Sequence, residues 1–426
     1  MSVVERLYEL YLGASCVVTD TRKIVKDSIF FALKGASFDG NNFAIQALEQ
    51  GAKCCVVDSR EVYEGSGERQ SQLLLVDDVL TALQELANHH RKALGLKIVA
   101  ITGSNGKTTT KELLTAVLSE KYRVTATVGN LNNHIGVPLT LLSMDAKTEL
   151  GIVEMGASAQ REIELLCGIA EPNFGLLTNV GRAHLEGFGG EEGVKKGKGE
   201  LFDFLVARGG VAFVANEDAV IASMARERGV ESVCYDYSLA NGVESQLEGE
   251  YNRYNIAAAV AIGSYFGVEK GRVEAAIAGY VPQNNRSQRV ESGANTLIMD
   301  CYNANPSSMQ AAINNFAAEE FGKSKVVILG DMLELGEWAD LEHDRVVERV
   351  AKSDVAVAAF VGKLFQSALS RYNNSGEING KRVFVAFEDR AELCDYIASH
   401  RELFEGRAIL IKGSRGIGLE VAAQSL

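Results

Sequence analysis

Short apolar runs alternate with amphipathic stretches along most of this chain, and this alternation predicts its secondary structure. In the middle of the chain, each apolar run has the length and composition of a buried strand, and stretches of helical periodicity separate the runs. Strands that alternate with helices form a largely parallel sheet covered by helices. The predicted strands of this region are 97–102, 150–154, 174–178, 211–215 and 232–235.

The beginning of the chain shows the same alternation on a smaller scale. Apolar runs at 28–33 and 54–58 predict two strands, and the stretch between them predicts a helix that ends at Gly51. Residues 61–72 are rich in Glu, Gly, Ser and Gln, which favours an exposed loop. A helical pattern over 79–94 then leads into the middle region.

The end of the chain predicts a second doubly wound unit. The sequence turns polar at 281–286, which indicates a hinge, and five further strand-like runs follow. Helical stretches separate these runs, as expected for a sheet with helices on both faces. The predicted strands are 296–300, 325–330, 357–362, 382–387 and 407–412.

A length of 426 residues agrees with roughly three domains. We therefore predict an α/β protein with a small N-terminal α/β module over 1–85. A central parallel sheet occupies 86–288, and a C-terminal Rossmann-like, doubly wound domain occupies 289–426. In such sheets ligands bind at the carboxyl ends of the strands, so the functional residues should follow the predicted strands directly.

The run GSNGKTT at 103–109 is the strongest chemical signal. It follows the predicted strand 97–102 and opens a helical stretch at 111–118. A strand, a glycine loop and a helix in this order form a phosphate cradle, because backbone N–H groups and the helix N-terminus face an anion. Lys107 can reach the outer phosphates, and the hydroxyl of Thr108 can hold Mg²⁺.

This motif departs from the usual P-loop pattern at one position, because Ile101 stands where the pattern has its first glycine. An ordinary strand–helix turn that contains Lys and Thr is the alternative interpretation. The flanking strand and helix favour nucleotide binding, so the central domain resembles a P-loop ATPase.

Polar residues follow other predicted strands as well. Glu154 ends one strand and could reach a Mg²⁺ held by Thr108, although a capping carboxylate is the alternative. His184 lies in a glycine-rich loop after another strand, where a structural role is the alternative to a functional one. Lys198 could point inward from an amphipathic helix, whereas Lys195 fits a solvated face.

Two asparagines and one carboxylate complete the candidates around a nucleotide. Asn252 and Asn255 begin a helix of small residues and could meet a base or ribose, with helix capping as the alternative for Asn252. Asp300 ends a strand and precedes a polar loop that contains Tyr302, Asn303 and Asn305, where an interdomain site would lie.

The run GSRGIG at 413–418 is similar to the dinucleotide loop of short-chain dehydrogenases. However, Lys412 replaces the first glycine of that loop, and too little chain follows to add another strand. We interpret the segment as an anion- or substrate-binding loop that uses Lys412, Ser414 and Arg415.

Composition narrows the function classes further. A net charge of −13 disfavours nonspecific nucleic-acid binding. Seven cysteines without CxxC spacing favour buried, reduced thiols and a cytoplasmic location. The first residues lack the apolar core of a signal peptide, and no apolar run approaches the length of a membrane span.

Taken in order, these motifs resemble the Mur ligases of peptidoglycan synthesis, and the resemblance spans nearly the whole chain. The blocks YNANP at 302–306 and GDMLELG at 330–336 resemble most closely the branch that adds D-Ala-D-Ala. The segment 19–43 resembles the N-terminal uridine-nucleotide module of the family. The other similar blocks are 129–142, 154–158, 178–189, 196–202 and 411–416.

The resemblance implies an ATP-dependent ligase that joins D-Ala-D-Ala to UDP-N-acetylmuramoyl-tripeptide through an acyl phosphate. It implies ATP and two Mg²⁺ ions as cofactors, with Lys198 carried as a carbamate, and a monomeric protein. Lys107, Lys198 and His184 would be catalytic, and Thr108, Glu154, His184 and Lys198 would hold metal. The implied ATP-binding residues are Gly103, Ser104, Asn105, Gly106, Lys107, Thr108, Thr109, Asn255, Arg286 and Asp300. The implied substrate-binding residues are Thr21, Arg22, Asp39, Gly40, Tyr302, Asn303, Asn305, Lys412 and Ser414.

Two other functions remain open from the sequence. A folylpolyglutamate-type ligase would share the ATP module, but it has no reason to carry the YNANP block or a uridine module. A nucleotide switch protein would share the phosphate loop, but the guanine-reading [NT]KxD motif is missing from the chain.

Overall fold

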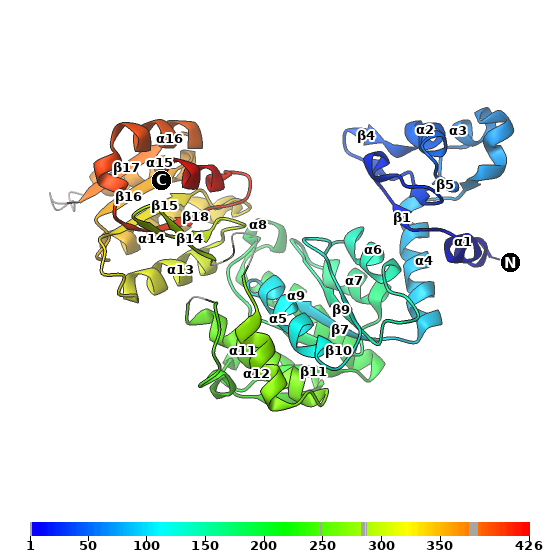
Figure 1. The fold of residues 1–426 in the computed structure, drawn as a ribbon, viewed down its shortest axis with the longest axis horizontal. Coiled ribbons are helices and arrows are strands. Elements are labelled where there is room, and N and C mark those ends of the chain that lie inside the picture. Colours follow the sequence, from blue (N-terminus) through cyan, green and yellow to red (C-terminus); the bar gives the residue numbers. More distant parts are fainter. Residues whose placement is uncertain (1, 248, 283–285, 287, 375–381) are drawn as a thin grey trace.

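The computed structural model describes residues 2–247, 249–282, 286, 288–374 and 382–426. Figure 1 shows three α/β domains, with the N-terminal domain at the right, the C-terminal domain at the left and the central domain below, joining them. The predicted fold class is therefore confirmed. Among the described residues, every helix is too short or too polar to cross a lipid bilayer.

The N-terminal domain is built on a parallel sheet with the strand order β1-β2-β5-β6. The two strands predicted in this region correspond to β2 and β5, whose residues are fully buried. Its strands are β1 (Val17–Val18), β2 (Ile29–Phe31), β5 (Cys54–Val57) and β6 (Leu73–Leu75), with a small hairpin of β3 (Lys34–Gly35) and β4 (Phe38–Asp39). Its helices are α1 (Val3–Leu12), η1 (Thr21–Lys23), η2 (Gly40–Phe43), α2 (Ala44–Glu49), α3 (Arg60–Gly65) and η3 (Gly67–Gln72).

The predicted loop at 61–72 is wrong, because α3 and η3 occupy this segment. The hydroxyl of Ser59 accepts a hydrogen bond from the backbone N–H of Val62 and caps α3. A capped first turn offsets the poor helix propensity of the Gly and Ser residues that favoured a loop.

The central domain contains a six-stranded parallel sheet with the order β12-β11-β10-β7-β9-β8. All five predicted strands are present, and the short edge strand β8 is the one that the pattern missed. The strands are β7 (Lys97–Thr102), β8 (Val124–Ala126), β9 (Leu150–Glu154), β10 (Phe174–Leu177), β11 (Val211–Ala215) and β12 (Glu231–Tyr235). The helices are α4 (Val79–Leu94), α5 (Lys107–Ser119), α6 (Gly136–Leu142), α7 (Glu162–Ala170), α8 (Leu185–Phe188), α9 (Glu191–Arg208), α10 (Ala219–Arg228), η4 (Tyr237–Ala240), α11 (Tyr251–Tyr265) and α12 (Lys270–Gly279).

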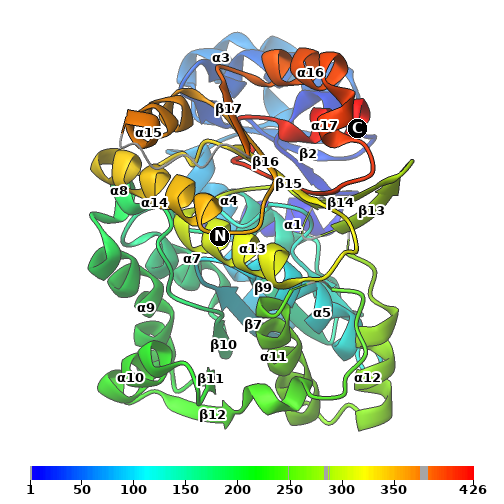
Figure 2. The same cartoon turned by 90° about the vertical axis from the view of Figure 1, so that its left-hand side faces the viewer.

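Strand β7 shows why the strands of this sheet have continuous apolar sequences. Ile98 and Ala100 pack into one hydrophobic cluster, while Val99 and Ile101 pack into another on the opposite face. Helices cover both faces, so neither face can carry polar residues. Figure 2 shows β7, β9 and β10 inside this layered arrangement.

The C-terminal domain contains a second six-stranded sheet with the order β13-β14-β18-β15-β16-β17. Its five predicted strands are confirmed, and only β13 pairs antiparallel, at an edge. Its strands are β13 (Gln288–Ser292), β14 (Asn295–Asp300), β15 (Lys325–Gly330), β16 (Val357–Val361), β17 (Val383–Phe387) and β18 (Ala408–Lys412). Its helices are α13 (Pro306–Ala318), η5 (Gly336–Trp338), α14 (Ala339–Ala351), α15 (Lys363–Asn374), α16 (Arg390–Ser399), α17 (Arg401–Phe404) and η6 (Leu419–Ser425).

The predicted domain boundaries stay predictions. Helix α4 runs across residue 85 and packs against α1 on one side and against α6 and α7 on the other. Half of the predicted hinge at 281–286, residues 283–285, lies outside the described residues. After β18 the chain forms η6 instead of another strand, which agrees with rejecting a dehydrogenase fold for GSRGIG.

His343 on α14 is a buried neutral histidine that holds the loop after β15. Its Nε2 accepts a hydrogen bond from the backbone N–H of Met332 at 3.1 Å, and its Nδ1 lies 2.7 Å from the carbonyl oxygen of Ala339. An accepting Nε2 requires the tautomer with its proton on Nδ1. Burial lowers the pKa of His343 below its ordinary value, and the nearby Asp331 only partly opposes this.

We expect this histidine to make the C-terminal domain sensitive to acid. The unfolded state takes up a proton below about pH 6.5, whereas folded His343 resists protonation, so stability is lost as the pH falls from there toward the lower folded pKa. The His343→Gln variant should lose less stability over this window, by up to about 1.4 kcal/mol per pH unit. Urea unfolding between pH 8 and pH 5.5, followed by the fluorescence of the single tryptophan, Trp338, measures this difference.

The His134→Gln variant is the control, because His134 is exposed and lies in the central domain. It should follow the wild-type pH dependence. Parallel curves for wild type and His343→Gln would contradict the assignment of a neutral buried histidine.

Candidate active site

The loop between β7 and α5 depends on two glycines. Gly103 has a φ of +142° and Gly106 a φ of +79°, and both values favour glycine. A Cβ on Gly103 would lie 2.0 Å from Oγ1 of Thr178, and one on Gly106 would lie 2.6 Å from Oδ1 of Asn255. Because Gly106 is also the N-cap of α5, no side chain occupies the exposed N–H groups of that helix.

The segment after β10 holds this loop in place. Oγ of Ser104 donates to the carbonyl oxygen of Gly181 and accepts from its backbone N–H, both at 2.9 Å. The backbone N–H of Asn105 donates to Oδ1 of Asn179 at 3.0 Å, and Thr178 donates to the carbonyl oxygen of Asn105 at 2.6 Å. Since β10 neighbours β7, the two strand ends brace one another.

Lys107 lies over its own loop. Its Nζ donates to the carbonyl oxygens of Gly103 at 2.7 Å and Ser104 at 3.3 Å. Burial lowers the pKa of Lys107, Glu154 opposes that shift, and Arg286 adds to it. A cation held among these groups gains strongly from a multiply charged anion placed beside it.

Glu154, at the end of β9, has one carboxylate oxygen without a partner. Its Oε1 accepts from Oγ1 of Thr108 at 3.2 Å and from Nδ2 of Asn132 at 2.8 Å. Its Oε2 is buried and has no hydrogen-bond partner among the described residues, and the side chain is 1% exposed. A buried carboxylate oxygen without a hydrogen-bond partner is stabilised by a nearby cation. The oxygens of Thr108 and Glu154 are ligands of the kind that Mg²⁺ prefers, so the pair fits a Mg²⁺ site.

Lys198 points inward from α9, as its amphipathic segment indicated. It is 1% exposed, its Nζ donates to the carbonyl oxygen of Ala157 at 3.1 Å, and it lies 5.2 Å from the ring centroid of Phe188. Burial strongly lowers the pKa of Lys198. The neighbouring Gly197 permits this packing, because a Cβ there would lie 2.5 Å from the ring of Phe188.

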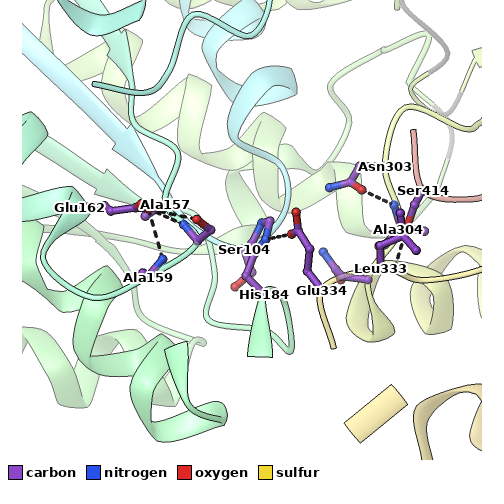
Figure 3. A network of polar contacts seen from close by, with 12 residues as sticks. Ser104, Ala157, Ala159, Glu162, His184, Asn303, Ala304, Leu333, Glu334 and Ser414 are labelled. Carbon is purple, nitrogen blue, oxygen red and sulfur yellow. Dashed lines mark hydrogen bonds and ion pairs between the residues drawn. The ribbon is translucent and has the colours of Figure 1, made fainter. Parts of the chain in front are cut away.

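His184 adopts a left-handed backbone conformation, with a φ of +53°, immediately before α8. Its Nδ1 contacts Oε2 of Glu334, which lies in the C-terminal domain. Burial lowers the pKa of His184, Glu334 opposes this, and Lys107 and Lys198 add to it. Figure 3 shows His184 and Glu334 pointing toward one another across the domain contact.

A cavity of about 840 Å³ lies between the central and C-terminal domains. It brings together most residues that the sequence marked as functional, and the loop after Asp300, predicted to lie where an interdomain site would be, forms part of its lining. The predicted residues that line it are Ser104, Asn105, Gly106, Lys107, Thr108, Thr109, Glu154, His184, Asn252, Asn255, Arg286, Asp300, Tyr302, Asn303, Asn305 and Lys412.

Two asparagines on α11 occupy the wall beside α5. Asn252 is the second residue of α11, whose N-cap is Glu250, so the capping interpretation for Asn252 is wrong. Nδ2 of Asn255 donates to Oδ1 of Asn252 at 2.9 Å, and Thr110 donates to Oδ1 of Asn255 at 3.1 Å. This network fixes the amides where they face the cavity.

The C-terminal residues that the sequence marked for substrate binding form hydrogen bonds mainly within their own domain. The buried Lys412 donates to Oδ2 of Asp300 at 2.6 Å, and Ser414 accepts from the backbone N–H of Leu333 at 3.1 Å. Asn305 caps α13 and also donates to Oδ1 of Asn105 at 2.8 Å, which links the two domains.

Some predicted residues lie outside the cavity lining. Gly103, Lys198, Ser414 and Arg415 are not among its lining residues, although the guanidinium of Arg415 lies 5.5 Å from the ring centroid of Tyr302, which does line it. The four residues implied for the uridine nucleotide belong to the N-terminal domain, where Asp39 caps η2 and Gly40 approaches the backbone of Leu33 closely. Those four residues are Thr21, Arg22, Asp39 and Gly40.

Sequence reasoning gave no role to three residues that shape this site. Asn132 contacts Glu154, Arg182 pairs with Glu342 across the domains at 2.9 Å, and Glu334 contacts His184. Their place in the sequence could have indicated two of them, because Asn132 lies in the block 129–142 and Glu334 in the block 330–336, both of which resemble family motifs. Across the described residues, no three His, Cys, Asp or Glu side chains gather so as to hold a metal by themselves.

Family models match the three domains in order. The Mur ligase family catalytic domain matches residues 14–91, and the Mur ligase middle domain matches 101–244. The Mur ligase glutamate ligase domain matches 285–415.

Similar proteins and structures extend over nearly the whole chain. The UDP-N-acetylmuramoyl-tripeptide–D-alanyl-D-alanine ligase of Bacillus subtilis is 34% identical over 96% of this chain and 92% of its own. MurF from Acinetobacter baumannii is 28% identical, with a TM-score of 0.86 over 99% of this chain and 98% of its own. MurF ligase from Thermotoga maritima, solved in complex with ADP, shares the fold at 24% identity, with a TM-score of 0.80 over 97% of both chains. Because family models match its three domains in order and the Bacillus subtilis ligase is 34% identical to it over 96% of its length, this chain belongs to the Mur ligase family.

Proposed function

We propose that this chain uses ATP to join D-Ala-D-Ala to UDP-N-acetylmuramoyl-tripeptide in peptidoglycan precursor synthesis. The observation that carries the proposal is the cavity in which the glycine loop faces the YNANP loop of the C-terminal domain. The similarity to the Bacillus subtilis ligase over 96% of the chain supports the choice of substrates.

ATP fits the central wall of this cavity. The backbone of Gly103–Thr109 and the N-terminus of α5 would bind the phosphates, with Lys107 beside the outermost one. Asn255, Arg286 and Asp300 line the same cavity and would contact the rest of the nucleotide.

Thr108 and Glu154 would hold one Mg²⁺, and His184 and Lys198 would serve a second. Mg²⁺ supplies charge neutralisation for the phosphates and usually takes only one or two protein carboxylates, which agrees with the sparse ligand set here. Lys198 would act as a carbamate formed with CO₂, because an ammonium cannot ligate a cation whereas a carbamate oxygen can. Its burial beside His184 and Lys107 supports this modification.

The reaction has two displacements. An oxygen of the tripeptide carboxylate attacks the γ-phosphorus of ATP, ADP leaves and an acyl phosphate forms. The amine of D-Ala-D-Ala then attacks the acyl carbon, inorganic phosphate leaves and the amine gives up a proton. Little covalent chemistry falls to the protein, so its contribution is to align the reactants and to stabilise developing charge.

The remaining substrate contacts divide between the outer domains. Thr21, Arg22, Asp39 and Gly40 would bind the uridine nucleotide, while the C-terminal domain would receive the dipeptide. In that domain Tyr302 and Asn303 would touch the substrate, and Asn305, Lys412 and Ser414 would shape the loop that presents them.

We also propose that the chain works as a monomer in the cytoplasm. Both walls of the cavity come from one chain, so catalysis needs no second copy. All seven cysteines are free thiols, as expected for a reducing compartment.

The first test separates this ligase from a folylpolyglutamate-type ligase and from a nucleotide switch. Phosphate release from ATP should require both UDP-tripeptide and D-Ala-D-Ala, because each displacement needs its own acceptor. A coupled phosphate assay with each compound omitted in turn measures this. ATP turnover that neither compound changes would favour a switch, and turnover that requires folate and glutamate would favour the other ligase.

The second test concerns Lys107. The Lys107→Ala variant should lower kcat by at least ~10³, because charge stabilisation of this kind contributes several kcal/mol. Steady-state phosphate release measures the loss. Lys195→Ala is the matched control, since Lys195 is partly exposed on α9. Near-wild-type turnover of Lys107→Ala would defeat the assignment.

The third test concerns Lys198. The Lys198→Ala variant should lose turnover, and short-chain carboxylates should restore part of it by supplying the missing oxygens. With ¹³C-labelled bicarbonate, the wild-type protein should show a carbamate carbon resonance that Lys198→Ala lacks and Lys195→Ala keeps. Identical spectra for wild type and Lys198→Ala would show that the buried amine is unmodified.

A further inference from the structure

We propose that Glu334 of the C-terminal domain positions His184 of the central domain, so that docking of the C-terminal domain completes the second metal site. This inference rests on the proposed function, because it concerns the same reaction. It gives a role to a carboxylate that lies outside the ATP-binding and metal-binding residues described above.

The geometry of the pair favours a positioning role. Oε2 of Glu334 contacts Nδ1 of His184, and no other described residue forms a hydrogen bond with that ring. A carboxylate on Nδ1 selects the tautomer with its proton there and leaves a lone pair on Nε2. Histidines that ligate metals commonly have a carboxylate partner of this kind on the second ring nitrogen.

Hydrogen bonds with three neighbours hold the loop that carries Glu334, whose own side chain is 61% exposed. The backbone N–H of Met332 donates to His343, and that of Leu333 donates to Ser414. Asp331 accepts from the first backbone N–H groups of α15. The carboxylate of Glu334 is therefore carried by the C-terminal domain as a body and moves with it.

The C-terminal domain forms hydrogen bonds with residues just before and just after His184 in the sequence. Nη1 of Arg182 donates to Oε1 of Glu342 at 2.9 Å, and its backbone N–H donates to Oγ of Ser307 at 2.8 Å. On the other side, the backbone N–H of Glu186 lies 3.4 Å from the carbonyl oxygen of Glu334. Figure 3 shows the two segments meeting through His184 and Glu334.

The backbone conformations of His184 and Glu334 also support a positioning role. His184 has a φ of +53° and Glu334 a φ of +62°, values that residues with side chains rarely adopt. Such conformations persist where surrounding contacts hold them, and they gather at functional sites. Here the surrounding contacts are those between the domains, so separation of the domains would release the orientation of the imidazole.

The test uses Mn²⁺ as the metal probe and the full-length protein with a nonhydrolysable ATP analogue and UDP-tripeptide. Electron paramagnetic resonance counts bound Mn²⁺ and gives its affinity. Glu334→Ala should bind the second Mn²⁺ 10- to 100-fold more weakly, the usual effect of removing such a partner. Glu334→Gln should lie between, because its amide oxygen still accepts from Nδ1. Glu337→Gln is the control, since it removes the same charge from an exposed neighbour.

Two further measurements separate positioning from a general structural defect. Glu334→Ala should lower kcat in proportion to its loss of Mn²⁺, with KM for ATP changed less than threefold. The fluorescence of Trp338, which lies against Gly190 of the central domain, should report that the variant remains folded.

Each outcome decides between the two proposals. If the wild-type protein does not turn over, the proposed function fails. If it turns over but binds a single Mn²⁺, the second metal site fails and the inference about Glu334 fails with it. If the wild type binds two and Glu334→Ala binds them equally well, the inference about Glu334 is overturned. Tighter binding in Glu334→Ala would also overturn it, because the carboxylate would then compete with the metal for His184. Should the alanine variant unfold, Glu334→Gln against Glu337→Gln carries the same comparison.

Discussion

The close approach of the glycine loop to the segment after β10 is the constraint on which the rest of the site depends. A side chain at Gly103 would collide with Thr178, and Ser104 exchanges two hydrogen bonds with Gly181. This packing directs the N-terminus of α5 into the interdomain cavity. It also carries the chain toward His184, so one contact between neighbouring strand ends positions both the proposed phosphate-binding loop and the proposed metal ligand His184.

Buried charged groups with unfavourable surroundings lie close to that contact. Burial lowers the pKa of both Lys107 and Lys198, and Lys107 lowers the pKa of Lys198 further. Glu154 offers only one bonded carboxylate oxygen and leaves the other buried without a partner. A protein keeps such groups close together when a charged ligand balances them, which agrees with a triphosphate and divalent cations as the missing charges.

The two domains share the work unequally. The central domain supplies the glycine loop proposed to bind phosphate, while the C-terminal domain supplies the opposite wall and a set of polar contacts. These contacts, Asn305 with Asn105, Arg182 with Glu342 and Glu334 with His184, are hydrogen bonds and ion pairs. Polar contacts of this kind separate at modest cost, as an enzyme that must admit three substrates requires.

The sequence by itself determined the three α/β units, most of their strands and the residues at the strand ends. It could do so because buried parallel strands read as apolar runs and because ligands gather at their carboxyl ends. It missed α3, where the cap of Ser59 outweighed a loop-like composition, and the edge strands β8 and β13, which are too short or too polar. It also missed the two- and three-residue strands β1, β3, β4 and β6 of the N-terminal domain, which are too short to show a pattern.

Only the tertiary structure decided which distant residues meet. His184 and Glu334 are 150 positions apart, and no local periodicity links them. The inward turn of Lys198 was a possibility in the sequence, but its burial depends on the packing of Gly197 against Phe188. The physical reason is that the pattern of apolar residues within a segment depends only on how that segment is buried. Contacts between domains depend instead on the shapes and charges of the surfaces of the folded domains.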